Sequence, residues 1–380
     1  MGVPPLPRTP GGSGRFFEAY TQGFTTVELE RLFTRDTPDA YRFFSRNIDF
    51  EHLKKLPWHR RTLAHLRLLF LAFTMKLTPA RRAIYGASLL FVIFGLLELF
   101  QGWRLLILPH PVFAPGAMWL VAGFLLINLL VLLEVADRLS LKNDLEIARE
   151  IQQAMLPRGA FHAPGIEAFG MTRPANTVGG DFYDILPLPD GRVLLALGDV
   201  AGKGSPAALL MALLLAMMRT LVDEGLEGAA LAERLNVQIA RHAPRSRFVT
   251  LFVSVLNPTT GELVYVNAGQ NPPLLRRCNG SYERLRSGGM ALGMFDGSCY
   301  EQEVIQLRPG DLLFCYTDGV TEALNVEGEE FGEARLQALL CEFARLPAEE
   351  VRAAVVERVL AWCRGTPQHD DLTFVVLKVR

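Results

Sequence analysis

The sequence predicts an α+β domain in its second half, preceded by a helical N-terminal region with two transmembrane helices. From about residue 165 onward, short apolar strand-like runs alternate with turns, and helices intervene in pairs at about 206–243 and 332–364. Runs of strands with paired helices are typical of α+β folds and not of a doubly wound βαβ fold. Two long apolar runs upstream of the domain predict the membrane helices.

Length and composition fit this division. The 380 residues suit two or three folded units, half of them are hydrophobic, and the net charge is −1. The charge is uneven, because residues 1–82 carry 14 Lys and Arg against 7 Asp and Glu. A basic segment beside an apolar one favours a membrane surface over nucleic acid, although a solvated basic face also fits. The five cysteines show no close spacing, which indicates reduced core residues in a reducing compartment.

Residues 1–80 form a basic N-terminal region. Residues 1–15 are rich in Pro, Gly and Ser and are predicted to be disordered. Two amphipathic helices are expected after them, at 27–33 and 62–75. No apolar run follows a basic start, so no cleavable signal peptide is predicted.

Residues 81–135 are predicted to cross the membrane twice. The runs Ala83 to Trp103 and Gly116 to Leu133 are each long enough for a hydrocarbon core about 30 Å thick. A pair of buried core helices is the alternative. Lys and Arg flank the two runs, and the loop between them has only Arg104. This bias predicts a two-pass protein of the inner membrane with both termini and the α+β domain in the cytoplasm.

Residues 136–158 are predicted to be a helical signalling linker. Apolar and polar positions in 134–157 follow a four-three spacing for about two heptads, which is shorter than a secure coiled coil. A packed linker and a plain amphipathic helix both remain open. The same helix is a candidate for pairing two copies of the chain into a homodimer.

Residues 159–380 form the predicted α+β domain. A turn at Asn257-Pro258 separates two of its strands. The expected strands are Gly179 to Leu188, Val193 to Leu197, Val249 to Leu256, Glu262 to Asn267, Asp311 to Tyr316 and Leu372 to Val379.

Four short acidic stretches lie at strand ends of this domain, and they predict a metal site. One acid at a strand end is ordinary, but four suggest loops that meet at one end of a sheet. Two like charges about 4 Å apart cost roughly 4 kcal/mol at an effective dielectric constant near 20, so such a cluster needs cations. Oxygen ligands favour Mg²⁺ or Mn²⁺ over zinc. The hypothesis is a binuclear site of a hydrolase, built from 178–184, 198–204, 316–322 and 370–373.

The spacing within the stretches separates candidate ligands from supporting acids. Asp181 and Asp184 are an odd number of residues apart, so a regular strand points them to opposite faces. Asp181 follows a Gly-Gly bend and is the preferred ligand, while Asp184 is expected either to support a ligand or to lie on the surface. Of Asp370 and Asp371, one can bind metal and the other support it. A phosphate-binding P-loop is disfavoured, because the spacing around Lys203 does not match GxxxxGK.

The chain resembles the bacterial PPM-type serine/threonine phosphatases, which are related to protein phosphatase 2C, in the branch of SpoIIE and RsbU. The resemblance covers about 140–380 and not residues 1–135. Gln270 departs from it, because His is common at this position. The motifs that carry the resemblance lie, in family order, at 146–152, 155–157, 179–184, 198–204, 206–211, 248–250, 267–273, 316–323 and 370–373.

The resemblance implies a four-layer α-β-β-α sandwich with two divalent cations, Mg²⁺ or Mn²⁺, at one end. Asp199 is similar to the carboxylate that bridges the two metals, and the Val200 carbonyl to the adjacent backbone ligand. Asp181 resembles the acid of the second metal. Asp318 and Asp370 resemble ligands of the first metal. The catalytic set is therefore expected to be Asp181, Asp199, Asp318 and Asp370, supported by Asp184 and Asp371.

The function implied is a membrane-tethered phosphatase that hydrolyses phosphoserine or phosphothreonine on a regulatory protein. In family terms the substrate resembles an anti-anti-sigma factor of the STAS type. Two metals about 3.5–4 Å apart can lower the pKa of a shared water from 15.7 toward ~7 and supply an attacking hydroxide. Helix 206–224 is expected to be either a switch that the linker moves or plain core. The alternative function is an inactive membrane scaffold that binds a phosphoprotein, and no nucleic-acid partner is predicted.

Overall fold

The computed structural model describes residues 57, 67, 70, 71, 74, 77–102, 115–157, 159–244 and 247–380. It divides the chain into two compact units, Met1–Arg138 and Leu139–Arg380. The predictions for 1–15, for 27–33, for most of 62–75 and for the loop between the two apolar runs lie outside the described residues.

The first unit contains the two predicted apolar helices. They are α5 (Pro79–Gly102) and the first part of α6 (Pro115–Met155). The rings of Phe91 and Trp119 lie 5.0 Å apart, and Nη2 of Arg81 lies 2.8 Å from Oδ2 of Asp137, so the two helices contact each other. Many of their large apolar side chains are exposed, as in Leu90 at 55%. Exposed apolar surface on this scale is what a membrane helix presents to lipid.

The described residues contain three helices long and apolar enough to cross a membrane, where the sequence predicts two. The third is α7 (Ser205–Asp223), which belongs to the second unit. Its side chains Met211, Leu214 and Met218 are completely buried in the core of that unit. Length and composition alone therefore do not separate a core helix from a membrane helix, whereas burial does.

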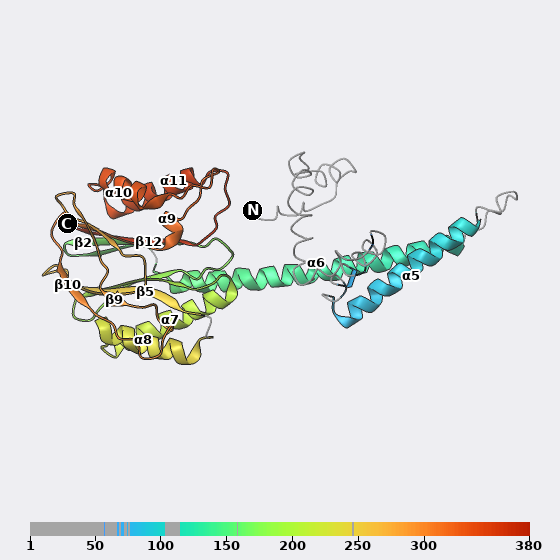
Figure 1. Ribbon diagram of the computed structural model, residues 1–380, viewed down its shortest axis with the longest axis horizontal. Coiled ribbons are helices and arrows are strands. Elements are labelled where there is room, and N and C mark those ends of the chain that lie inside the picture. The colour runs from blue at the N-terminus through green and yellow to red at the C-terminus, as the bar shows by residue number, and fades with distance from the viewer. Residues whose placement is uncertain are drawn as a thin grey trace, which may run out of the picture. The chain divides into compact units, whose positions relative to one another are not determined.

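Two six-stranded sheets form the middle of the second unit (Figure 1). Neighbouring strands pair antiparallel, except that β9 (Gly288–Gly289) pairs parallel with β6. Sheet A has the order β1 (Ala160–Ala163), β2 (Ile166–Arg173), β12 (Leu372–Val379), β11 (Leu312–Tyr316), β7 (Leu274–Arg276) and β8 (Tyr282–Arg284). Sheet B has the order β10 (Glu303–Gln306), β6 (Glu262–Ala268), β5 (Val249–Leu256), β4 (Val193–Val200) and β3 (Phe182–Pro187).

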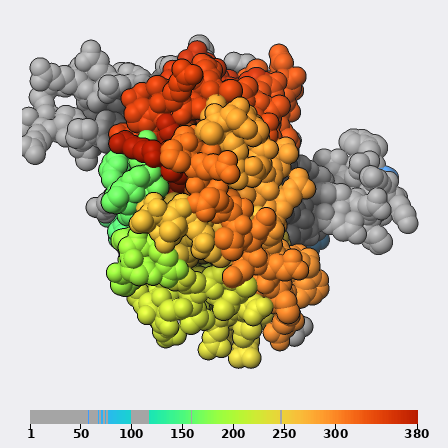
Figure 2. Space-filling model, turned by 90° about the vertical axis from the view of Figure 1, so that its left-hand side faces the viewer, coloured from blue at the N-terminus to red at the C-terminus, as the bar shows by residue number. Residues whose placement is uncertain are grey.

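Helices cover the outer faces of both sheets. α7 and α8 (Gly228–His242) pack on sheet B, and α10 (Gly332–Glu342) and α11 (Ala348–Trp362) pack on sheet A, beside the short α9 (Asp318–Thr321). A third apolar cluster lies between the sheets. In Figure 2 the red α10–α11 region and the yellow-green α8 region lie on opposite sides of the orange strands and loops. The predicted four-layer α-β-β-α sandwich is confirmed.

The alternation of side chains along β4 fixes which residues can reach the site. Leu194 and Ala196 pack toward α7 and α8, whereas Leu195 and Leu197 pack between the sheets. A strand buried on both faces needs apolar residues at odd-numbered and at even-numbered positions, and β4 has both. Odd-numbered positions on this strand therefore point toward sheet A.

Candidate functional site

Sheet B brings Asp181 and Asp199 side by side. Phe182 pairs with Gly198 in the antiparallel register of β3 and β4, and the next pair in this register is Asp181 with Asp199. Both are odd-numbered, so both continue the row of side chains that faces sheet A. At this end of the sandwich, carboxylates replace the apolar side chains that fill the space between the sheets.

Sheet A contributes the polar residues that face them. The backbone N–H of Thr317 donates to the carbonyl of Thr373 at 3.0 Å, which extends the pairing of β11 and β12 by one residue. The Thr317 hydroxyl donates to Oδ2 of Asp181 at 2.7 Å, across the space between the sheets. Asp318 follows as the first residue of α9, and Asp370 and Asp371 immediately precede β12.

Asp371 fastens the two sheets together. Its Oδ2 accepts the Gly180 N–H at 2.7 Å, and its Oδ1 accepts the Ala175 N–H at 2.8 Å. A Cβ on Gly179 would lie 2.3 Å from Oδ2 of Asp371, so only glycine fits there. The glycine pair of the motif is thus required by the close approach of Asp371 to the backbone before Asp181.

The acids raise one another's pKa. Burial raises the pKa of the Asp181 carboxyl well above its usual range, and the charges of Asp199 and Asp371 raise it further. Burial raises the pKa of Asp199 to about 6, although a hydrogen bond with Asp181 opposes this shift. Burial and the charge of Asp370 raise the pKa of Asp318. The cluster therefore carries more negative charge than its protein surroundings stabilise.

The donor set fits hard divalent cations. It consists of carboxylate oxygens together with the Val200 carbonyl, the ligands that Mg²⁺ and Mn²⁺ prefer. A Cβ on Gly180 would lie 3.0 Å from the Val200 carbonyl oxygen and 3.3 Å from Oδ1 of Asp199, so these two oxygens face the same narrow space.

Protein donors hold the acids in this structure. Thr317 bonds Asp181, and Nζ of Lys203 lies 2.8 Å from Oδ2 of Asp370. Among the described residues, no three Asp, Glu, His or Cys side chains converge closely enough to enclose an ion as they stand. A bound cation would therefore compete with Lys203 for Asp370.

The turn after β4 is held by Arg247. Gly202 has φ of 106°, a left-handed conformation that favours glycine, and a Cβ there would lie 1.5 Å from Nη1 of Arg247. The Arg247 guanidinium donates to the Ala201 carbonyl, and the Ala201 N–H donates to the Phe248 carbonyl at 3.0 Å. These contacts fix the path of the chain between Asp199 and Lys203.

Asp184 and Gln270 are held by protein partners of their own. Asp184 is fully buried on the opposite face of β3, where Oδ2 accepts Nε–H of Arg219 at 2.8 Å. Gln270 is also buried, and its Nε2 donates to the Tyr316 carbonyl of β11 at 3.2 Å. The residue that replaces the common His thus supports the strand that leads to Asp318.

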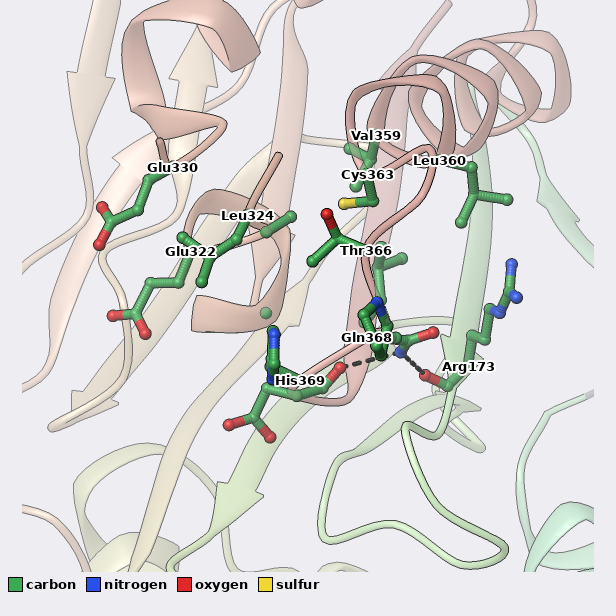
Figure 3. A pocket seen from close by; sticks show the side chains of 15 residues that line it. Arg173, Glu322, Leu324, Glu330, Val359, Leu360, Cys363, Thr366, Gln368 and His369 are labelled. Atoms are coloured by element: carbon green, nitrogen blue, oxygen red, sulfur yellow. Dashed lines mark hydrogen bonds between the residues drawn. The ribbon is translucent and has the colours of Figure 1, made fainter. Parts of the chain in front are cut away.

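A pocket of about 460 Å³ opens beside Asp370 and Gly319 (Figure 3). Glu322 and Glu330 lie on one side of it, and Arg173 lies on the opposite side. The pocket therefore joins an apolar surface to the acid cluster. Its apolar lining includes Leu324, Val359, Leu360, Cys363 and Leu372.

Sequence reasoning missed several residues that hold the candidate site. Thr317, Arg247 and Gln152 are examples, and Gln152 forms two hydrogen bonds with Gly179. Thr317 stands inside a quoted motif beside Asp318, and Gln152 inside the motif that leads into the domain, so their positions offered a signal. Arg247 lies just before a motif and offered none.

Comparison with solved structures defines the class of the domain. The SiaA-PP2C domain of Pseudomonas aeruginosa aligns with a TM-score of 0.57 and 24% identity, over 64% of this chain and 99% of that one. The second unit therefore has the fold of a PP2C-type phosphatase domain. Residues 189–380 match the sequence model of the family described as Stage II sporulation protein E (SpoIIE). The chain belongs to the SpoIIE family.

Two relatives extend the similarity. Protein IcfG of Synechocystis sp. is 29% identical over an alignment of 279 positions, which covers 66% of this chain and 44% of IcfG. The phosphoserine phosphatase RsbU of Bacillus subtilis is 28% identical over 240 residues, which are 63% of this chain and 70% of RsbU. The matched region is thus less than half of IcfG.

Proposed function

We propose that this chain is a metal-dependent protein phosphatase that hydrolyses phosphoserine or phosphothreonine. The observation that carries the proposal is that Asp181 and Asp199 from sheet B lie at the same end of a PP2C-type sandwich as Asp318 and Asp370 from sheet A, whose charges raise the pKa of Asp199. Membership of the SpoIIE family and the similarity to a phosphatase named for phosphoserine support it.

The site residues would hold two divalent cations, Mg²⁺ or Mn²⁺. Asp181, Asp199, the Val200 carbonyl, Asp318 and Asp370 are the residues that would hold them. Two such ions, when bound, polarise phosphoryl oxygens and lower the pKa of water to about 7.

The remaining contacts orient these ligands. Thr317 holds Asp181 through its hydroxyl, and Asp371 supports the site by holding the backbone before Asp181. The pocket beside Asp370 offers the surface on which residues flanking the phosphorylated side chain would lie.

The substrate is proposed to be a phosphorylated regulatory protein of the STAS type. Residues 81–135 would tether the enzyme to the cytoplasmic membrane in two passes, with both termini and the domain 159–380 in the cytoplasm. The apolar surface of α5 and of the first part of α6 supports this tether. Residues 136–158 would be a helical signalling linker, and the same helix would pair two copies of the chain into a homodimer. Residues 1–80 would form a separate N-terminal region.

The test is phosphatase activity of the full chain in detergent. Wild type is assayed with a phosphoserine peptide and with p-nitrophenyl phosphate in Mn²⁺ or Mg²⁺, and is compared with Asp199→Asn. Asp190→Asn is the matched control, because Asp190 lies in an exposed turn. Turnover that Asp199→Asn removes and Asp190→Asn preserves supports the proposal. Turnover that Asp199→Asn leaves unchanged rejects the site, and no turnover with an intact fold favours the phosphoprotein-binding scaffold.

A further inference from the structure

The last turn of α6 holds the backbone that precedes Asp181. Nε2 of Gln152 donates to the Gly179 carbonyl at 2.7 Å, and the Gly179 N–H donates to Oε1 of Gln152 at 3.1 Å. Gln152 is 7% exposed. One buried amide side chain thus satisfies both backbone groups of a residue that lies two positions before a proposed metal ligand.

The two glycines before Asp181 form backbone hydrogen bonds with side chains from other parts of the domain. Gly179 and Gly180 carry no side chains, and a glycine backbone loses more conformational freedom on ordering than any other. Their backbone is held by Gln152 at Gly179 and by Asp371 at Gly180. The Asp181 carboxylate is bonded by Thr317, but the backbone that leads to it depends on hydrogen bonds with two side chains, one on α6 and one before β12.

Further bonds attach the end of α6 to the same strand. Nη2 of Arg219 donates to the Met155 carbonyl at 2.7 Å, while Nε of the same guanidinium binds Asp184 on β3. The Tyr183 hydroxyl donates to the Pro157 carbonyl at 3.0 Å. The helix end cannot shift along β3 without breaking these bonds together with both bonds of Gln152.

We infer that Gln152 is a positioning residue, through which the end of α6 sets the backbone of 179–181 and hence the place of Asp181 beside Asp199. The inference rests on the proposed function for the role of the metal, but not for the hydrogen bonds themselves. Displacement of the last turn of α6 would release Gly179 and lower the affinity of the site for cations. The end of α6 is thereby a point at which the site is controlled.

The experiment compares Gln152→Met with Gln153→Met in the full chain. Methionine keeps the length of glutamine and removes its hydrogen bonds. Gln153 is the exposed neighbour on the same helix, so it controls for the substitution itself. Mn²⁺ affinity is measured by electron paramagnetic resonance, amide exchange by mass spectrometry over peptides that contain 179–181, and kcat with p-nitrophenyl phosphate at several Mn²⁺ concentrations.

We expect Gln152→Met to weaken Mn²⁺ binding about 10–100-fold, as is typical when support of a metal ligand is lost. Exchange over 179–181 should rise at least about tenfold. Saturating Mn²⁺ should restore much of kcat, a response that general unfolding would not give. Gln152→Asn, which is too short to reach Gly179, should resemble Gln152→Met, and Gln153→Met should resemble wild type.

Wild-type exchange over 179–181 in Gln152→Met would overturn the inference, and so would wild-type Mn²⁺ affinity. If the proposed phosphatase function is wrong, the three measurements give a different set of results. In that case wild type binds no Mn²⁺ or turns over no substrate, while amide exchange still reports whether Gln152 holds the backbone.

Discussion

The two sheets contribute to the candidate site in different ways. Sheet B supplies Asp181, which is buried, and Asp199, which is half-buried, as cross-strand neighbours in a row that is otherwise apolar. Sheet A supplies Asp318, Asp370 and Asp371 from the residues that follow β11 and precede β12. The Asp370 side chain is 45% exposed, whereas Asp181 is 4% exposed.

The acids of the two sheets are therefore held in different ways. Asp199 lies within β4, so the strand fixes its place, and Asp181 lies one residue before β3, where Gln152 and Asp371 hold the preceding backbone. On sheet A, Asp370 lies in the segment before β12, where its half-exposed side chain pairs with Lys203. Binding and catalytic residues commonly lie on loops that a rigid scaffold positions, and the acids of this cluster are divided in the same way between a strand and the segments beside strands.

The sharpest test of the comparison removes one acid from each sheet. Asp181→Asn and Asp318→Asn should each lower kcat by at least about 10²-fold, more than the loss of a supporting residue. Residues that act as one unit give non-additive losses, so the double variant should be little worse than the poorer single one. The measurement is kcat with p-nitrophenyl phosphate at saturating Mn²⁺. Fully multiplicative losses would show that the two sheets act independently.

The next effect concerns the residue that joins the sheets. Asp371→Asn should lower activity about 10–100-fold, because an amide can accept only one of the two N–H bonds that Asp371 now accepts from Gly180 and Ala175. The variant is assayed beside Asp190→Asn, with circular dichroism to verify the fold. Activity equal to that of the control would mean that Asp371 does not set the position of Asp181.

A smaller effect is expected at Lys203, whose ammonium group pairs with Asp370. Lys203→Met removes the ammonium group from Asp370, and an exposed ion pair is worth about 0.2–1 kcal/mol. Mn²⁺ should therefore bind up to about fivefold more tightly, as measured by calorimetry. Lys142→Met, which changes an exposed lysine on α6, is the control. Weaker binding in Lys203→Met would show that Lys203 supports the metal site and does not compete with the ion.

Patterns within short stretches of the sequence predicted much of this arrangement. Strand period placed Asp181 and Asp184 on opposite faces, and in the structure Asp184 binds Arg219 away from the acid cluster. The predicted bounds of β5 and β12 are those observed. These features depend on neighbours in the chain, and alternation along a strand reports them directly.

Features that depend on contacts between distant residues could not be predicted. Thr317 is a common polar residue, and its bond to Asp181 exists because the two sheets face each other. Strands β7, β8 and β10 are three or four residues long, too short for a periodic signal. Helix α7 has a membrane-like composition, and only its burial against sheet B identifies it as core.

The last test concerns the stability of sheet A away from the site, where no effect on activity is expected. Glu167 on β2 is buried, and its Oε1 accepts the N–H of Ala348, the first residue of α11, at 2.8 Å, while Oε2 pairs with Arg380. Burial raises the pKa of Glu167, but the bond from Ala348 and the charge of Arg380 outweigh it, so the pKa is lowered overall. The charged form therefore stabilises the fold at neutral pH.

Glu167→Gln should lower the free energy of unfolding at pH 7 by about 1.5–3 kcal/mol, the range for hydrogen bonds to charged groups. A lowered pKa means that this stability is present above the unfolded value of about 4.3 and is lost as pH falls through the folded pKa. The difference in free energy of unfolding between the variant and wild type should thus disappear at low pH. Denaturant unfolding at pH 7, 5 and 3 measures it, with Glu357→Gln on the exposed face of α11 as control. A difference in free energy of unfolding that stays constant with pH would mean that the variant loses packing and not the interactions of the Glu167 charge.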